Sequence, residues 1–293
     1  MTKKEAGGKS APPLTMHDRD ESISARDYSR LRQLIYDEAG IALGPERKTM
    51  LEVRIRRRLK ELAIHSYGEY CDHLFSRQGM ESELDHLIDV VTTNKTDFFR
   101  EPGHFELLTT KVLATLSSNP LLVWSAGCST GEEPYTLAMV LSEHALAHSE
   151  FSFRILATDV STTVLRKAQL GIYSSEAVRP VPTALKVKYL LRSRDPGAER
   201  VRVAPELRRL VDFRRLNFME SDYGITRKVS VVFCRNVIIY FDRLTQQRIL
   251  RRITDCLEPG GYLFVGHAET LHALDLPLVP IAPTLYRRID ESA

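Results

Sequence analysis

The chain has 293 residues, 43% of them hydrophobic and 27% charged, with a formal net charge of +3. These values are ordinary for a soluble globular protein, and the length suggests one large or two modest domains. A net charge this small gives no indication of nucleic-acid binding, because such domains carry a concentrated basic face.

The cysteines and the apolar segments exclude further classes. Cys71, Cys128, Cys234 and Cys256 lie far apart, and the chain has neither a CxxC pair nor an HExxH motif. We therefore expect no disulfide framework and no metal site, and reduced thiols fit a cytoplasmic protein. No apolar segment is long enough to span a membrane, so the chain is not expected to be membrane-inserted.

The first predicted elements are a tail and a helical domain. Residues 1–21 are polar, lack the apolar core of a signal peptide and are expected to be disordered. Residues 22–90 are expected to form about four helices, the first capped by Ser24 and ended by Gly40. Two later helices are expected near 67–75 and 81–90.

The helix predicted over 46–64 has two distinct faces. Its apolar residues repeat at helical spacing, and they are Leu51, Ile55, Leu59 and Leu62. The arginines that gather on a neighbouring face are Arg47, Arg54, Arg57 and Arg58. This face is either an ordinary solvated surface or a surface that attracts an acidic partner.

Residues 91–293 are expected to form an α/β domain. Strands are predicted at 121–124, 151–157, 229–234, 262–265 and 285–288, and helices at 134–148, 165–168 and 245–257. Such alternation is typical of a doubly wound, mostly parallel sheet. Residues of about 173–213 interrupt it and are expected to form a small β insertion with a hairpin. Its arginines indicate either a solvated loop or a contact surface.

Three loops after predicted strands are expected to meet at one edge of the sheet, where doubly wound sheets bind ligands. The first, AGCSTGEEP (126–134), has Gly127 and Gly131 for tight turns and Glu133 at the start of a helix. Asp159 ends the second strand, and CRNV (234–237) follows a later one.

The glycine loop is unsuited to a dinucleotide. It lacks the GxGxxG pattern and adds two acids where a pyrophosphate would bind. A positively charged nucleoside fits better, since carboxylates can bind the amino group of S-adenosylmethionine and Asp159 can bind its ribose. The loops therefore predict a methyltransferase.

Structural roles stay open for several of these residues. Thr130 and Glu133 have the spacing of a capping box, and Asp159 could cap the following helix. Arg235 could be a surface charge. Cys128 is expected to pack in the loop, and His267 is expected to be structural rather than a base.

Five longer stretches resemble the chemotaxis-receptor glutamate O-methyltransferases, the CheR family. They are TTNKTDFFREP (92–102), WSAGCSTGEEPYTLAM (124–139), ILATDVS (155–161), FCRNVIIYFD (233–242) and LEPGGYLFVGHAET (257–270). Their order and spacing match from Ser22 onward. The resemblance implies a Rossmann-like methyltransferase domain, S-adenosylmethionine as cofactor and S-adenosylhomocysteine as product.

The resemblance also implies the site residues. Those placed around the cofactor are Asn94, Thr96, Arg100, Glu133, Asp159, Asn217, Phe218, Asn236 and Val237. Glu133 would hold the methionine end, with Glu132 an open alternative, and Asp159 would bind the ribose. Arg100 and Tyr240 match the residues nearest the reacting methyl group.

The implied partner is the cytoplasmic helical domain of a chemoreceptor. The helical domain would contact it, with Arg54, Arg57 and Arg58 as recognition residues. The insertion would be the family's small β-subdomain. Members that dock on a receptor's C-terminal peptide have glycine-spaced turns there, whereas LRSRDPGAERVRV (191–203) has only Gly197, so peptide binding stays open. A monomer is the expected state.

Two other functions remain as alternatives. An enzyme that methylates nitrogen often has an Asn-Pro-Pro-Tyr-like turn after the fourth strand, but residues 236–240 contain no proline. A non-catalytic cofactor-binding copy is the second, and intact Arg100, Asp159 and Tyr240 count against it. Glutamate transfer needs no general base, because a glutamate with a pKa near ~4.3 is already ionised.

Overall fold

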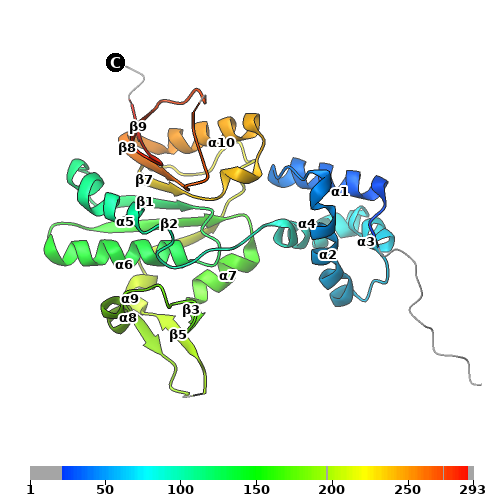
Figure 1. Ribbon diagram of the computed structural model, residues 1–293, viewed down its shortest axis with the longest axis horizontal. Coiled ribbons are helices and arrows are strands. Elements are labelled where there is room, and N and C mark those ends of the chain that lie inside the picture. Colours follow the sequence, from blue (N-terminus) through cyan, green and yellow to red (C-terminus); the bar gives the residue numbers. More distant parts are fainter. Residues whose placement is uncertain (1–21, 196, 273, 290–293) are drawn as a thin grey trace, which may run out of the picture.

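The computed structural model describes residues 22–195, 197–272 and 274–289, so the predicted tail over 1–21 lies outside the described residues. A helical domain lies beside a seven-stranded sheet, and a three-stranded sheet projects from the lower edge of the larger domain (Figure 1). None of the described helices is both long and apolar enough to cross a membrane.

The helical domain contains α1 (Ala25–Ala39), η1 (Pro45–Arg47), α2 (Lys48–Leu62), α3 (Tyr67–Leu74) and α4 (Arg77–Val91). The Ser24 side chain accepts a hydrogen bond from the Asp27 N–H, and Gly40 ends α1 with φ of 70°, as predicted. Leu51, Ile55 and Leu59 of the predicted stripe are buried, whereas Leu62 is only partly buried.

The larger sheet has the strand order β6-β2-β1-β7-β8-β10-β9. Its strands are β1 (Leu121–Ala126), β2 (Phe153–Asp159), β6 (Val211–Arg215), β7 (Val229–Cys234), β8 (Leu257–Val265), β9 (Leu278–Ala282) and β10 (Leu285–Arg288). The pairings from β6 to β8 are parallel, and β10 pairs antiparallel with both β8 and β9. The predicted doubly wound, mostly parallel sheet is therefore confirmed.

Helices cover both faces of this sheet. α5 (Gly103–Leu107), continued by η2 (Leu108–Val112) and η3 (Leu113–Thr115), and α6 (Glu132–Ala147) lie away from α10 (Arg243–Cys256) (Figure 1). α7 (Thr162–Leu170) connects β2 to the insertion. In β7, Val231 and Phe233 belong to one apolar core and Val232 and Cys234 to the other. Burial on both faces explains why the strand is a continuous apolar run.

The insertion differs from the prediction. It forms a three-stranded sheet of β3 (Ile172–Ser174), β5 (Arg200–Val203) and β4 (Leu190–Arg192), with α8 (Thr183–Tyr189) between β3 and β4 and α9 (Pro205–Arg208) after β5. Residues 211–213, assigned to the insertion from sequence, belong to β6 and pair in parallel with β2. The strand predicted at 262–265 is also longer than expected, because β8 begins at Leu257 directly after α10 and includes Pro259, Gly260 and Gly261.

Candidate active site

The carboxyl ends of the parallel strands open into a pocket that the helical domain closes on one side. The space between its walls is about 980 Å³ when the part open to solvent is included. The residues of the predicted cofactor site that line it are Asn94, Thr96, Arg100, Glu133, Asp159, Asn217, Phe218, Asn236 and Val237. Tyr240 lines it as well, and Ala39, Ile41 and Arg47 contribute from the helical domain.

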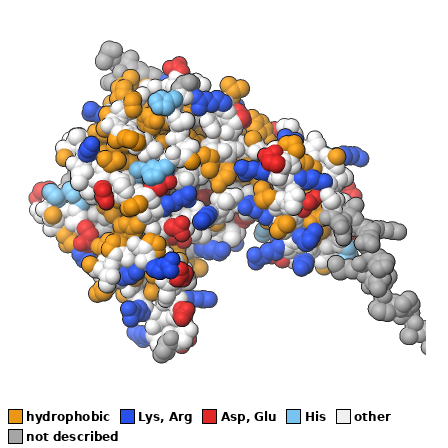
Figure 2. Space-filling view, in the orientation of Figure 1, with side chains coloured by type: hydrophobic (Ala, Val, Ile, Leu, Met, Phe, Trp, Pro, Cys, Tyr) orange, Lys and Arg blue, Asp and Glu red, His pale blue; other side chains and the backbone are white. Residues whose placement is uncertain are grey.

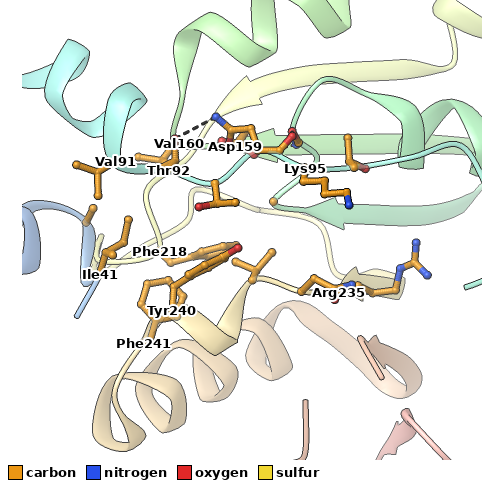
Figure 3. Close-up of a pocket in the computed structure, with 18 of the residues that line it drawn as sticks. Ile41, Val91, Thr92, Lys95, Asp159, Val160, Phe218, Arg235, Tyr240 and Phe241 are labelled. Carbon is orange, nitrogen blue, oxygen red and sulfur yellow. Dashed lines mark hydrogen bonds between the residues drawn. The ribbon is translucent and has the colours of Figure 1, made fainter. Parts of the chain in front are cut away.

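The walls of the pocket differ in chemistry. Figure 3 shows the rings of Phe218, Tyr240 and Phe241 grouped on one wall, with Ile41 and Val91 nearby. Lys95 and Arg235 lie toward the other end. An apolar wall at one end and charged groups at the other suit a ligand with an aromatic ring and a charged tail.

The loop after β1 needs its glycines. Gly127 and Gly131 have φ of 84° and 95°, a region that favours glycine. A Cβ on Gly127 would lie 2.4 Å from a Val237 methyl group, and one on Gly131 would lie 2.8 Å from the Ala168 Cβ. The two glycines therefore bring the backbone of this loop close to the neighbouring loop and to α7.

Asp159 connects the first two loops. Its Oδ2 accepts the Ser129 N–H at 2.9 Å and its Oδ1 accepts the Ser161 N–H at 3.0 Å. Burial raises the pKa of the Asp159 carboxyl, although these N–H groups oppose the shift. The alternative that Asp159 caps α7 is wrong, because Ser161 is the N-cap and accepts the Val164 N–H.

Glu133 forms a buried ion pair rather than a capping box. Its Oε2 accepts from Arg235 Nε at 2.7 Å and its Oε1 from Ser125 Oγ at 2.7 Å. Thr130 Oγ1 donates instead to Glu132 Oε2 at 2.7 Å, and Gly131 is the N-cap. Glu133 lines the pocket, and Glu132 is not among its lining residues.

Arg235 is the largest departure from the sequence analysis, which allowed it to be a surface charge. Its side chain is 2% exposed. Besides Glu133, its Nη1 donates to the Arg100 carbonyl at 2.8 Å and lies 3.0 Å from His104 Nδ1 and 3.4 Å from Glu101 Oε2. One guanidinium therefore joins the helix after β1 to the turn that carries Arg100.

Glu101, His104 and His267 place potential metal ligands within 4.8 Å of one another. The Arg235 guanidinium already lies among these atoms and would repel a second cation. Burial, assisted by Arg235, lowers the pKa of His104 to about 4, so the ring is neutral. Burial opposes ionisation of Glu101, but the Asn236 amide and Arg235 hold its pKa below the ordinary value.

The segment between the domains places Arg100 in the pocket. Phe99 and Glu101 on either side have φ of 54° and 56°, which is uncommon for residues with a Cβ. Arg100 donates to the Lys95 carbonyl at 3.0 Å and to Asn236 Oδ1 at 2.9 Å. Both acceptors are uncharged groups, so neither competes with an anionic ligand for the positive charge of Arg100.

Asn217 links the sheet to the helical domain. Its amide donates to the Glu38 carbonyl, and its Oδ1 accepts the Met219 N–H at 3.0 Å. Phe218 is 8% exposed and packs against Trp124 and Phe241. Asn217 therefore positions the domains, and Phe218 provides the apolar surface.

The predicted recognition arginines lie outside the pocket and differ in exposure. Arg54 donates to the carbonyls of Val90, Val91 and Thr92 at 3.0, 2.7 and 3.0 Å, and so caps the end of α4. Arg58 forms a bidentate pair with the buried Glu83 at 2.8 and 2.7 Å. The Arg57 side chain, in contrast, is 87% exposed.

Sequence reasoning left Arg47 and Glu269 out of the site and gave Arg235 no role there. Arg47 lines the pocket, and Glu269 is 6% exposed behind the turn after β7. The arginine-rich pattern over 46–64 includes Arg47, but no local pattern distinguishes it from its neighbours. Glu133, the ion-pair partner of Arg235, lies 102 residues away, and three of the four N–H groups that Glu269 accepts lie 31–33 residues away, beyond the reach of local patterns.

Two family models match the chain and divide it between them. Residues 94–280 match the CheR methyltransferase SAM-binding domain, and residues 26–92 match the CheR methyltransferase all-alpha domain.

The chain also aligns with known proteins over nearly the whole length of both partners. The chain is 39% identical to chemotaxis protein methyltransferase 2 of Pseudomonas aeruginosa, over 91% of this chain and 95% of that protein. It is 38% identical to the chemotaxis protein methyltransferase of Escherichia coli over 98% of each chain, and 36% identical to that of Borreliella burgdorferi over 91% and 95%.

Proposed function

Because this chain belongs to the CheR methyltransferase family, we propose that it methylates glutamate side chains on chemoreceptors. S-adenosylmethionine is the cofactor, since the family domain over 94–280 is a SAM-binding domain. The observation that carries the proposal is a single pocket lined by two carboxylates, Glu133 and Asp159, and by Arg100 and Tyr240. It supports a methyl donor and an anionic acceptor in one site.

The residues present fit S-adenosylmethionine. The loop at Gly127 allows close backbone approach, Asp159 has a carboxylate for the ribose, and Phe218 has an aromatic surface for the adenine. Glu133 is suited to the amino group of the methionine end. Its Oε1 and Oε2 are oriented by Ser125 and Arg235, at 2.7 Å each.

The reaction that we propose is attack of a glutamate carboxylate on the methyl group. Bound S-adenosylmethionine supplies a methyl group made electrophilic by the positive sulfur. The products are a methyl ester and S-adenosylhomocysteine, and both reacting charges disappear. Apolar walls at Ile41, Phe218 and Phe241 would favour this loss of charge by excluding water. Arg100 and Tyr240 would orient the carboxylate, which needs no base.

The helical domain is the proposed receptor-facing surface. On the face shown in Figure 2, Lys and Arg side chains gather over the helical domain and over the small sheet. Of the predicted recognition arginines, Arg57 is the one directed at solvent, and Arg54 and Arg58 support the domain from within. An exposed cation of this kind would steer an acidic receptor helix and raise the rate of encounter. The reaction that we propose takes place on the cytoplasmic helices of the receptor.

The test is transfer of labelled methyl from S-adenosylmethionine to chemoreceptor-containing membranes, followed by mild base. Release of volatile methanol supports a carboxyl ester, and Tyr240→Phe and Arg100→Lys should lower the transfer by at least tenfold. Base-stable label would contradict the proposal by indicating transfer to nitrogen. Cofactor binding without any transfer to several receptors would indicate a non-catalytic binding protein.

A further inference from the structure

Glu269 is a buried carboxylate whose partners are backbone groups. It follows β8 and is 6% exposed. Its Oε2 accepts the N–H groups of Asn236 and Gly266 at 2.8 and 2.6 Å, and its Oε1 accepts those of Val237 and Ile238 at 2.8 and 2.9 Å. Within the described part of the chain no Lys, Arg or His side chain forms an ion pair with it.

These hydrogen bonds fix an unusual piece of backbone. Asn236 has φ of 59°. The N–H groups of Val237 and Ile238 lie at the start of the 3₁₀ turn η4 (Ile238–Tyr240), and the side chain of its N-cap residue, Val237, forms no capping hydrogen bond. Glu269 therefore satisfies donors that a short helix leaves unpaired. Without it, the buried N–H groups would lose their acceptor, and Asn236 would keep this conformation with only part of its present hydrogen bonds, those of its side chain with Arg100 and Glu101.

The residues held in this way face the pocket. Asn236 Oδ1 accepts from Arg100 at 2.9 Å, and Asn236 Nδ2 donates to Glu101 at 3.2 Å. Val237 and Tyr240 line the pocket on the same turn. A displacement of this turn would move the Arg100 guanidinium and the Tyr240 hydroxyl together.

A glycine completes the contact between the two loops. A Cβ on Gly266 would lie 2.8 Å from Asn236 Nδ2 and 2.9 Å from the Asn236 backbone nitrogen. Such distances require the neighbour to move. The loop after β8 thus meets the turn after β7 at two points: the Glu269 carboxylate accepts its N–H groups, and Gly266 leaves no room for a side chain beside Asn236.

We propose that Glu269 is a positioning residue of the methyl transfer: its carboxylate fixes the turn after β7, so that Asn236, Arg100 and Tyr240 meet the donor and the acceptor in a reactive geometry. The inference rests on the proposed function and deepens it, because it assigns to the loop after β8 a role in turnover. Glu269 acts through the backbone and touches neither substrate.

Glu269→Gln tests the carboxylate with little change in shape. In either amide orientation the NH2 group would face two N–H donors, so two of the four hydrogen bonds are lost. Gly266→Ala displaces the same turn and leaves the carboxylate intact. Glu258→Gln is the matched control, since Glu258 lies on β8 and accepts only from Ser118 at 2.9 and 2.8 Å among the described residues.

The measurement is kcat at saturating S-adenosylmethionine and receptor, divided by the number of sites that bind S-adenosylhomocysteine in calorimetry. We expect kcat per site to fall about 10- to 100-fold in Glu269→Gln and in Gly266→Ala, with a smaller loss of S-adenosylhomocysteine affinity. Glu258→Gln should match the wild type in both quantities.

A merely structural role would give a different result. It would reduce the number of binding sites and leave kcat per site unchanged, which would overturn the inference. If Glu269→Gln does not fold, the same ratio of kcat to binding sites, measured for Gly266→Ala, tests the inference. Absence of transfer by the wild-type protein would instead contradict the proposed function, so the two failures are distinguishable.

Discussion

At the scale of single residues, the two neighbouring glutamates of the glycine loop have separate environments. Glu133 pairs with Arg235 and lines the pocket, whereas Glu132 accepts from Thr130 and does not. Burial raises the pKa of Glu132, and no cation pairs with its carboxylate among the described residues. Only the charge of Glu133 is therefore placed to act on a ligand.

Replacement of the two glutamates by glutamine should separate their roles. Glu133→Gln removes the charge for the methionine amino group and leaves Glu101, at 3.4 Å, as the carboxylate paired with Arg235, so S-adenosylhomocysteine affinity should fall at least about tenfold. Glu132→Gln can still accept from Thr130 and should bind within about twofold of the wild type. Calorimetric titration measures both. A larger loss for Glu132→Gln would contradict the assignment.

His104 predicts a pH dependence of stability. Its pKa is about 4 in the folded protein against an ordinary 6.5, so between these values the unfolded chain binds more protons. The free energy of unfolding should therefore rise with pH across this window. The contribution of His104 to this rise should reach its full value, up to about 3 kcal/mol, above pH 6.5.

The check is urea unfolding of the wild type and His104→Gln between pH 4 and pH 6.5. The slope of the free energy against pH should be shallower in the variant, by up to about 1.4 kcal/mol per pH unit. The exposed His65 is the control, and His65→Gln should keep the wild-type slope. Equal slopes in all proteins would show that His104 does not titrate in this way.

At the scale of elements, the arginines of α2 divide into structural and exposed positions. Arg54 donates hydrogen bonds to the carbonyls at the end of α4, at the point where the chain continues to Asn94 and Thr96. The same helix exposes Arg57, which pairs weakly with Glu61 at 3.5 Å. A basic helix face in a sequence therefore combines residues of different roles.

Two methionine variants test this division. Arg54→Met removes the hydrogen bonds that the guanidinium donates to the carbonyls at the end of α4. The free energy of unfolding should therefore fall by about 2 kcal/mol. Arg57→Met should change it by less than about 0.5 kcal/mol, and should instead reduce the salt dependence of receptor methylation. Urea unfolding and methylation at two ionic strengths measure these effects. Equal stability losses would contradict the division.

At the scale of the whole molecule, the pocket lies between two domains that contact each other around it. Tyr36 donates to Asp242 at 2.8 Å, the Ala42 N–H donates to the Tyr240 carbonyl at 3.1 Å, and Arg215 pairs with Asp85 at 2.8 Å. A ligand in the pocket therefore touches both domains, and its binding energy stabilises their contact.

Hydrogen exchange should record this coupling. S-adenosylhomocysteine at about 100 times its Kd should raise the free energy of unfolding by about 2.7 kcal/mol. Amide exchange should slow around residues 39–41 as well as around residues 236–240, because both segments line the pocket. Strands β4 and β5 lie apart from it and should be unchanged. Protection confined to the larger sheet would contradict a shared site.

Elements that are determined by their own residue pattern were predicted correctly, whereas elements that depend on partners distant in the sequence were not. Residues 229–234 were predicted as a strand and form β7, because burial on both faces leaves a continuous apolar run. Residues 211–213 were misassigned, since their sheet partners lie in β2, more than 50 residues earlier. β9 was missed because Pro280 argues against a strand, although an edge strand tolerates it.

The candidate site shows the same limit. Long motifs identified the lining residues, because motifs preserve residue types at fixed spacing. The buried partners that hold those residues, Arg235 and Glu269, act through contacts between distant loops. Burial of a charged side chain depends on the whole fold, so no local pattern predicts it.

The most direct test of the account is mass-spectrometric mapping of a chemoreceptor after incubation with the protein and isotope-labelled S-adenosylmethionine. The account predicts labelled methyl groups on glutamate side chains of the receptor's cytoplasmic helices, removed by mild base and absent with Tyr240→Phe. Label on lysine or arginine nitrogens, or an unlabelled receptor while S-adenosylhomocysteine binds tightly, would contradict it.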